Sequence, residues 1–480
     1  MNTIVLKYLK NKGYSNVSND YYEYVEAWEQ YWKNNADYIT YTDEYQKKNQ
    51  LYTLGMAKRV CEDWASIISS EKDTIVSNKS QNEEYIKNIV NELQLKTNLP
   101  RCVEIASWSG TCGAVIRLKN IAVKNGILQK TDKTSQELIK VNAKQIIPLS
   151  IENGIIKEVA FTSDSVVDNK KAIYIELHEL VKDGYKISNI YLDVQTGKEI
   201  TKDGILGEFE TKSFIPLFSL LMPPKNNSID NNMGLGMSIY ADALPQIEAT
   251  DITYNNFVMD FYLGGKKVFY NKKIVGTKTV TIKNADGTTT SKDIPLYPDD
   301  LTKQQWKVVG DGMENINDNP LFHEYNPQLR TEEDKNGVQF ALDTLSFKCG
   351  FGTKYYQFNG STIVTATQYM GDRQDLVQNA KKFRDNLNEF TQNIVKASLL
   401  IGRMILGEKV TEECNVEIAN VDGFLTDTES LKEQYRQEIA MGIRKRWEYR
   451  VKFLGEDEET AKKMLKDDEI DDIELEEENE

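Results

Sequence analysis

Apolar residues recur at helical spacing over several stretches in the first part of the chain. Between Leu54 and Ile68 they stand three or four positions apart, as Met56, Val60 and Trp64 do. Tyr21 to Trp32 is a second such stretch, rich in aromatic residues. This spacing puts apolar side chains on one face of a helix, where a buried core face is the simplest use for them. The chain up to about residue 95 is therefore predicted to be helical.

Between about residues 114 and 222 the pattern changes to short runs of the β type. The runs include Ile146–Ile151, Ile155–Phe161, Ala172–Leu177 and Tyr185–Val194. Glu152-Asn153-Gly154 and Lys182-Asp183-Gly184 separate neighbouring runs, and such sequences favour tight turns. Antiparallel hairpins are predicted, and a loop at Pro223-Pro224 ends the block.

A helix predicted over 236–262 leads into a small β insert, and a second helix over 332–349 leads out of it. Pro245 should lie in the first turns of the first helix, and Gly264-Gly265 ends it. Within the insert, Asp286-Gly287 lies between alternating runs and predicts a hairpin. The predicted strands are Val268–Tyr270, Val280–Lys283, Ser291–Leu296 and Trp306–Val309. This order predicts a helical hairpin with β structure at its far end.

Gly350-Phe351-Gly352 ends the second helix and opens a polar, aromatic loop that runs to Gly360. The longest helical stripe of the chain follows that loop. It consists of Leu376, Ala380, Phe383, Leu387, Phe390, Ile394, Ala397, Ile401 and Met404. At 1.5 Å per residue such a helix would be about 50 Å long. Either a coiled-coil partner or a flat protein surface would explain the stripe.

The last part of the chain changes from basic to acidic. A helix is predicted from about Thr428 to Phe453, and a shorter one over 457–465 after Gly455. The basic residues of the first are Arg436, Arg444, Lys445, Arg446, Arg450 and Lys452. Residues 467–480 are almost wholly acidic. Such a run repels itself, so we expect it to be disordered and mobile in the free protein.

Composition limits the function classes. The 480 residues suggest roughly three domains, and 40 % hydrophobic residues are enough for a sizeable core. The net charge of −15 excludes a conventional DNA-binding protein, because phosphate binding is driven by basic residues that release counterions. An acidic chain can still surround DNA without holding it.

Motifs that would indicate catalysis are missing from the sequence. It contains no GxxxxGK[ST], HExxH or GxSxG pattern and no CxxC pair. The five cysteines are read as reduced thiols, and His178 and His323 as structural residues. We therefore predict no catalytic residue, no cofactor and no metal site. The many carboxylates leave a two-metal nuclease open, although a solvated acidic surface is the simpler interpretation.

Targeting and membrane signals are also missing. Residues 1–12 lack the apolar core of a signal peptide. No apolar run approaches the roughly 20 residues that a membrane-spanning helix needs. A soluble, intracellular protein is predicted.

Short motifs occur in order along most of the chain. They are Ala57–Cys61 with Trp64–Ile68, Gly234–Tyr240 with Asp251 and Tyr254, Thr365–Gln368, and Met441–Ile443 with Leu454–Ala461. They are similar, in turn, to an opening wing helix, the start of a stem helix, a TAT[E/Q] signature and a closing GxxxEEA segment. In this order, together with the interrupted helical hairpin, the chain resembles the portal proteins of long-tailed, siphovirus-type bacteriophages of Gram-positive bacteria.

The resemblance implies an α+β portal fold. Its parts would be a mixed α/β wing, a helical-hairpin stem, a small β-rich clip, a tunnel loop, a long wing helix and a helical crown. By position these are wing 1–235, first stem helix 236–265, clip 266–331, second stem helix 332–350, tunnel loop 351–365, long helix and remaining wing 366–425, and crown with acidic tail 426–480.

The resemblance also implies a function and partners. The chain would form a homo-oligomeric ring, usually of twelve subunits, at one capsid vertex of the virion, after assembly in the host cytoplasm. Double-stranded DNA would pass through the ring during packaging and ejection, without sequence specificity. Terminase, major capsid or scaffold proteins and head-completion proteins would dock on it, and no membrane is involved. Twelve such chains carry about −180 charges, and this repulsion would keep DNA sliding.

The resemblance places the DNA contacts of the channel at the tunnel loop. The candidate residues are Lys348, Thr353, Lys354, Tyr355, Tyr356, Gln357 and Asn359. The alternative is a buried hairpin in which Tyr355, Tyr356 and Phe358 are core residues. For the whole protein, the alternatives are another phage connector or baseplate component and a metal-dependent nuclease.

Overall fold

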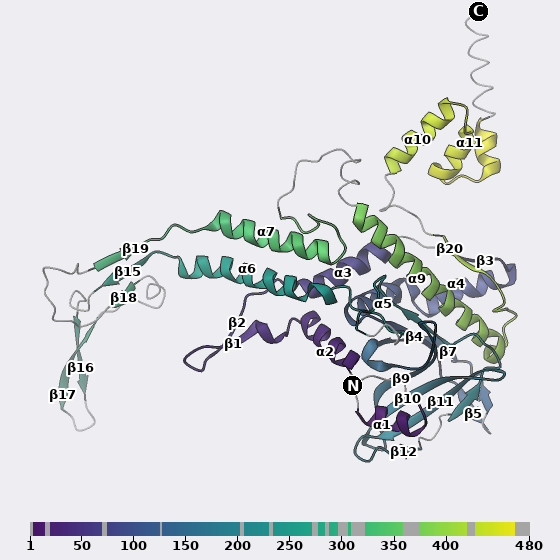
Figure 1. Ribbon diagram of the computed structural model, residues 1–480, viewed down its shortest axis with the longest axis horizontal. Coiled ribbons are helices and arrows are strands. Elements are labelled where there is room, and N and C mark those ends of the chain that lie inside the picture. The colour runs from purple at the N-terminus through teal and green to yellow at the C-terminus, as the bar shows by residue number, and fades with distance from the viewer. Residues whose placement is uncertain are drawn as a thin grey trace, which may run out of the picture. The chain divides into compact units, whose positions relative to one another are not determined.

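The computed structural model shows a mixed α+β fold, as the sequence predicts, with helices and several small sheets. It describes residues 3–14, 20–69, 74–124, 127–201, 206–229, 234–270, 277–283, 288–295, 306–308, 322–358, 374–419 and 428–465 (Figure 1). The chain forms two compact units. One contains Met1–Ala36, Gly55–Leu244 and Ser346–Glu480, and the other contains Asp37–Leu54 and Pro245–Leu345.

Helices dominate the start of the chain, as predicted, but short strands interrupt them. The helices are α1 (Thr3–Asn11), α2 (Asp20–Trp32), α3 (Met56–Ser69), α4 (Glu83–Glu92) and α5 (Leu95–Ser109). The strands that the sequence prediction missed are β1 (Thr40–Thr42), β2 (Lys48–Gln50) and β3 (Thr74–Ser77). β1 and β2 pair around a turn in which Asp43 Oδ1 accepts from the backbone of Tyr45 and Lys47, at 2.9 and 2.8 Å. These strands have three or four residues and no alternating apolar pattern, so periodicity cannot reveal them.

The predicted antiparallel hairpins form the largest sheet, in the order β12-β11-β10-β9-β8 with β13 also paired to β11. Its strands are β8 (Ile146–Glu152), β9 (Ile155–Val167), β10 (Lys170–Val181), β11 (Gly184–Asp193), β12 (Glu199–Ile200) and β13 (Glu208–Glu210). Asn153-Gly154 and Asp168-Asn169 connect β8, β9 and β10 with positive φ at both residues. Two-residue turns of this kind match the twist of paired strands.

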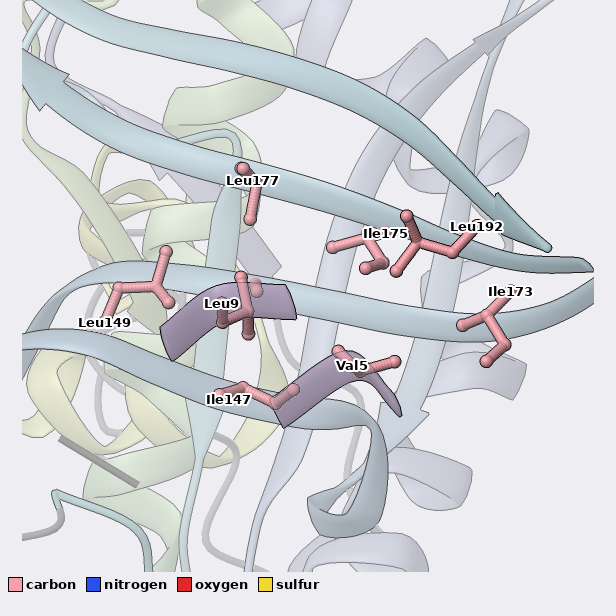
Figure 2. Packing of buried hydrophobic residues seen from close by; sticks show 9 residues of the cluster. Val5, Leu9, Ile147, Leu149, Ile173, Ile175, Leu177 and Leu192 are labelled. Carbon is pink, nitrogen blue, oxygen red and sulfur yellow. The ribbon is translucent and has the colours of Figure 1, made fainter. Parts of the chain in front are cut away.

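Helix α1 covers one face of this sheet. Val5 and Leu9 of α1 lie against Ile147, Ile173 and other aliphatic residues of β8, β10 and β11, all of them buried (Figure 2). A second sheet has the order β14-β4-β7, from β4 (Cys112–Lys119), β7 (Ser135–Asn142) and β14 (Phe218–Leu221). Between β4 and β7, β5 (Ala122–Lys124) pairs with β6 (Ile127–Gln129).

The second unit contains the helix–insert–helix segment. Its elements are α6 (Leu244–Leu263), β15 (Lys267–Tyr270), β16 (Thr277–Lys283), β17 (Thr289–Pro295), β18 (Trp306–Val308), β19 (Phe322–Tyr325) and α7 (Thr331–Lys348). The predicted hairpin is confirmed by the pairing of β16 with β17. β19, which the sequence prediction missed, pairs antiparallel with β15, and β18 pairs with β15 in parallel.

The predicted start of the first of these helices at residue 236 is wrong. The α-helix begins at Leu244, directly before Pro245, whose fixed φ suits a first helical turn. Residues 235–240 are instead buried without regular secondary structure. The Gly236 carbonyl accepts from Tyr21 Oη at 2.7 Å, and a Cβ at Gly236 would lie 2.2 Å from the Gly110 carbonyl oxygen. This close backbone approach holds the segment out of the helix.

The long helix is α9 (Gln374–Ile401), and a π-helical turn extends it over Gly402–Leu406. Its 28 residues correspond to about 42 Å. The predicted stripe from Leu376 to Ile401 is buried, so a surface of the same chain covers it. β20 (Val416–Ala419) follows and pairs with β3.

The single helix predicted over 428–453 is wrong, because it is broken. α10 (Thr428–Ala440) ends in a turn where Gly442 has φ +75°, and α11 (Arg446–Tyr449) follows, with a π-helical turn over Arg450–Leu454. The short helix after Gly455 is confirmed over residues 458–465. Residues 466–480 lie outside the described residues. Among the helices of the described ranges, none is both long enough and apolar enough to cross a bilayer.

Candidate functional site: the loop after α7

The candidate loop begins where the apolar stripe of α7 ends. Leu342, Leu345 and Cys349 are buried, and Gly350 then takes φ +83°, which ends the helix. Asn379 of α9 donates from Nδ2 to the Gly350 carbonyl at 3.0 Å. A side chain at Gly350 would crowd this amide, at 3.1 Å from its nitrogen. The first residue of the loop is therefore fixed against α9.

Phe351 anchors the loop through aromatic packing. Its fully buried ring stacks on Trp64 of α3, with 4.9 Å between centroids, and on Tyr355, with 4.4 Å between centroids. Trp64 also donates from Nε1 to the Cys349 carbonyl at 3.2 Å. Each aromatic pair of this kind adds about 0.5–1.5 kcal/mol to stability, in addition to the effect of burying its apolar surface.

Tyr356 adds a polar contact to this anchor. Its ring lies edge-on to Phe351 and Tyr355, at 5.7 and 4.9 Å between centroids. Burial, the negative charge of Asp63 and a hydrogen bond to Asp63 raise the pKa of Tyr356 well above its usual value. Asp63 is itself buried on α3 and pairs with Arg59, at 2.9 and 3.0 Å. Burial raises the pKa of Asp63, although Tyr356 and Arg59 oppose the shift.

The other candidate residues face solvent. Thr353, Lys354 and Gln357 are exposed, and Lys354 takes φ +67° in the turn. Lys348, in the last turn of α7, is exposed as well. The structure thus divides the loop into an anchoring pair, Tyr355 and Tyr356, and a group of outward polar side chains. Asn359 and the remainder of the predicted loop lie outside the described residues.

The alternative of a buried hairpin fits only part of the loop. Tyr355 and Tyr356 are half-buried against Phe351, as that alternative requires. Phe358, however, is 72 % exposed and cannot be a core residue of this unit. The loop is therefore a packed turn that presents polar groups and one phenyl ring.

A small cavity of about 110 Å³ lies behind the loop. Its lining is Trp64, Pro223, Pro224, Lys225, Ile239, Lys348, Cys349, Gly350 and Asn379. Lys225 is paired with Asp242 at 2.9 Å and donates to the Ile239 carbonyl. Of the polar groups in this lining, Asn379 bonds the base of the loop through the Gly350 carbonyl.

His178 has a structural environment. It is fully buried, its Nε2 lies 2.9 Å from Glu176 Oε1, and its ring meets Phe161 and Phe218 edge-on. Burial disfavours the charged form of Glu176, but His178 and Arg117 outweigh it and lower the pKa of Glu176 to about 2. His323 belongs to β19, where it pairs with Phe269. All five cysteines are buried and free.

Within the ranges that the structure describes, no group of three or more His, Cys, Asp or Glu side chains could hold a metal ion.

Sequence reasoning missed the residues that hold the loop. Trp64 was assigned only to a core face, and Asp63 and Asn379 were not considered. A signal existed at Asp63, a carboxylate inside a strongly apolar helix with Arg59 four residues before it. No model of a known protein family matches the chain, and no curated protein matches it.

Proposed function

We propose that the chain is a subunit of a bacteriophage portal, a ring through which DNA enters and leaves the capsid. The proposal rests on the helix–insert–helix segment, in which strand pairing joins the end of α6 to the start of α7. Strands β15 and β19 directly follow α6 and precede α7, and they pair in the register Lys267↔Tyr325. The chain therefore returns to the end of α6 after the insert, where α7 begins (Figure 1).

An ion pair reinforces this closure. Arg330, just before α7, lies 3.2 Å from Asp260 of α6, and its backbone N–H points to the same carboxylate at 3.4 Å. Helices of 20 and 18 residues are about 30 and 27 Å long. This hairpin with a β insert at its tip fits the stem and clip of a portal subunit.

Exposed apolar side chains on both helices support assembly. Phe340 and Phe347 of α7 are 72 % and 60 % exposed, and their spacing of seven residues puts them on one helical face. Phe261, Tyr262 and Leu263 are exposed at the end of α6. Phe340 and Phe347 together form an exposed apolar face on α7, and exposed apolar patches mark interaction surfaces. In a heterologous ring, each such surface would meet the next subunit.

The anchored loop fits the part of the ring that touches DNA. Phe351 and Tyr356 pack against the body of the chain, so the loop presents Lys354 and Gln357 to solvent on an anchored backbone. Such groups can contact phosphates without reading bases. The net charge of −15 per chain keeps the contacts weak, because most of the surface repels the duplex. Transient contacts of this kind suit DNA that must keep moving.

The assembly surface can be tested by substitution. Changing Phe340 and Phe347 to serine should lower the association of subunits by about tenfold or more, because each serine removes apolar area from the contact. Phe214, which is 65 % exposed and lies outside the helix–insert–helix segment, provides the matched control. Phe214→Ser should leave the assembly mass unchanged in light scattering. Equal assembly by both variants would argue against the proposed ring contact.

A further inference from the structure

Residues 428–465 contain a shallow pocket of about 330 Å³ with three arginines around it. The arginine pocket is lined by Arg436, Ile439, Arg446, Tyr449, Arg450 and Leu465. Two aliphatic side chains and one aromatic ring therefore lie beside the guanidinium groups. The pocket offers both positive charge and apolar surface to a binding partner.

The three arginines differ in how strongly nearby carboxylates pair with them. Arg450 makes a bidentate pair with Glu456, at 2.8 and 3.0 Å. Arg436 reaches Glu433 only at 3.5 Å, an exposed pair of a kind that contributes little, and its Nη2 donates to Tyr449 Oη, also at 3.5 Å. Arg446 is exposed and has no ion-pair partner among the described residues. Arg436 and Arg446 therefore keep donors for an anionic partner.

The chain itself contains a segment of matching chemistry. Residues 466–480 carry ten acidic residues and one lysine, a formal charge of −9, whereas residues 428–465 carry nine basic and eight acidic residues, a charge of +1. The aliphatic residues Ile470, Ile473 and Leu475 lie among these acids. The segment follows directly on Leu465, which lines the pocket. Its fifteen residues can span up to about 50 Å, so reach does not limit it.

We infer that the acidic segment 466–480 binds in the arginine pocket of its own chain. Its carboxylates pair with Arg436 and Arg446, and an aliphatic residue packs against Ile439 and Leu465. Charge-assisted pairs to arginine are among the stronger polar contacts. The covalent link raises the effective concentration of the segment to about the millimolar range, so even a weak contact is occupied. This inference does not depend on the portal proposal.

A labelled synthetic peptide of residues 466–480 tests the inference by fluorescence anisotropy. A chain that ends at Leu465 should bind the peptide, and the full chain should bind it about tenfold more weakly or worse, because its own segment fills the site. Arg436→Glu with Arg446→Glu in the shortened chain should weaken binding by about tenfold. Lys452→Glu, at an exposed lysine outside the pocket, should change it by less than about twofold.

A measurement on the full chain does not need the shortened variant to fold. Glu478→Cys gives a labelling site, since the five native cysteines are buried. A fluorophore there should move more freely after the double arginine substitution than after Lys452→Glu. Equal mobility in the two variants would overturn the inference. So would equal peptide binding by the full and shortened chains, or no binding by a folded shortened chain.

Discussion

Replacing Phe351 with alanine removes the ring that packs against Trp64, Tyr355 and Tyr356. Phe351 is fully buried, and loss of a buried phenylalanine costs about 3–5 kcal/mol. Tyr355 is half-buried and can move partly into the space, so we expect a loss near the lower value, about 3 kcal/mol. With roughly 2–4 °C per kcal/mol for a domain of moderate size, the melting temperature should fall by about 6–12 °C.

Phe358 provides a matched control in the same loop. It is the same residue type but 72 % exposed, so Phe358→Ala should change stability by less than about 0.5 kcal/mol. Differential scanning fluorimetry of the two variants measures the contrast. A melting temperature of Phe351→Ala within about 1 °C of the wild type, or equal losses in both variants, would refute the anchored-loop account.

The outward side of the loop should behave in the opposite way. Replacing Lys354 and Gln357 with alanine removes exposed groups, so the melting temperature should stay within about 2 °C of the wild type. DNA packaged per procapsid should fall by about twofold or more, because the phosphate contacts are lost. Lys10→Ala, at an exposed lysine on α1, is the control for loss of charge alone. Normal packaging with a large loss of stability would assign these residues a structural role.

Three further predictions concern other parts of the chain. The pKa of Glu176 in the folded protein lies below its unfolded value of about 4.3, so ionised Glu176 stabilises the folded state fully above about pH 4.3, and this stabilisation is lost as the pH falls towards about 2. The free energy of unfolding of Glu176→Gln, measured with urea, should therefore depend less on pH between these values. Asp251 is buried and accepts hydrogen bonds from Tyr38 Oη at 2.7 Å and from the Leu54 N–H at 2.8 Å. Asp251→Ala should therefore lower the free energy of unfolding by about 1–3 kcal/mol and speed proteolysis within residues 37–54. Deleting residues 467–480 should leave the number of subunits per particle unchanged in mass photometry.

The elements with long, regular patterns could be predicted from the sequence. The stripe of α9 has eight apolar positions in steps of three and four, and Gly350 and Gly352 correctly marked the loop after α7. The turns after β8 and after β10 were equally clear, because Asn153, Gly154 and Gly184 accept positive φ. In each case the signal lies within one continuous segment.

The remaining features depend on contacts that a local pattern does not contain. The stack of Phe351 on Trp64 joins residues 287 positions apart, and nothing in either segment indicates the other. The buried, irregular segment before α6 is set by the approach of Gly110 to Gly236, not by its own helical pattern. At Gly442 a local residue decides instead: its positive φ ends the helix although the neighbouring residues favour a helix.

Mass photometry and negative-stain imaging of the purified full chain test the central claim most directly. A subunit with an exposed apolar face on α7 and exposed aromatic residues at the end of α6 should form closed, heterologous rings. The particles should contain about ten or more copies and show a central hole. A strict monomer or dimer across a range of salt and protein concentrations would contradict the portal proposal.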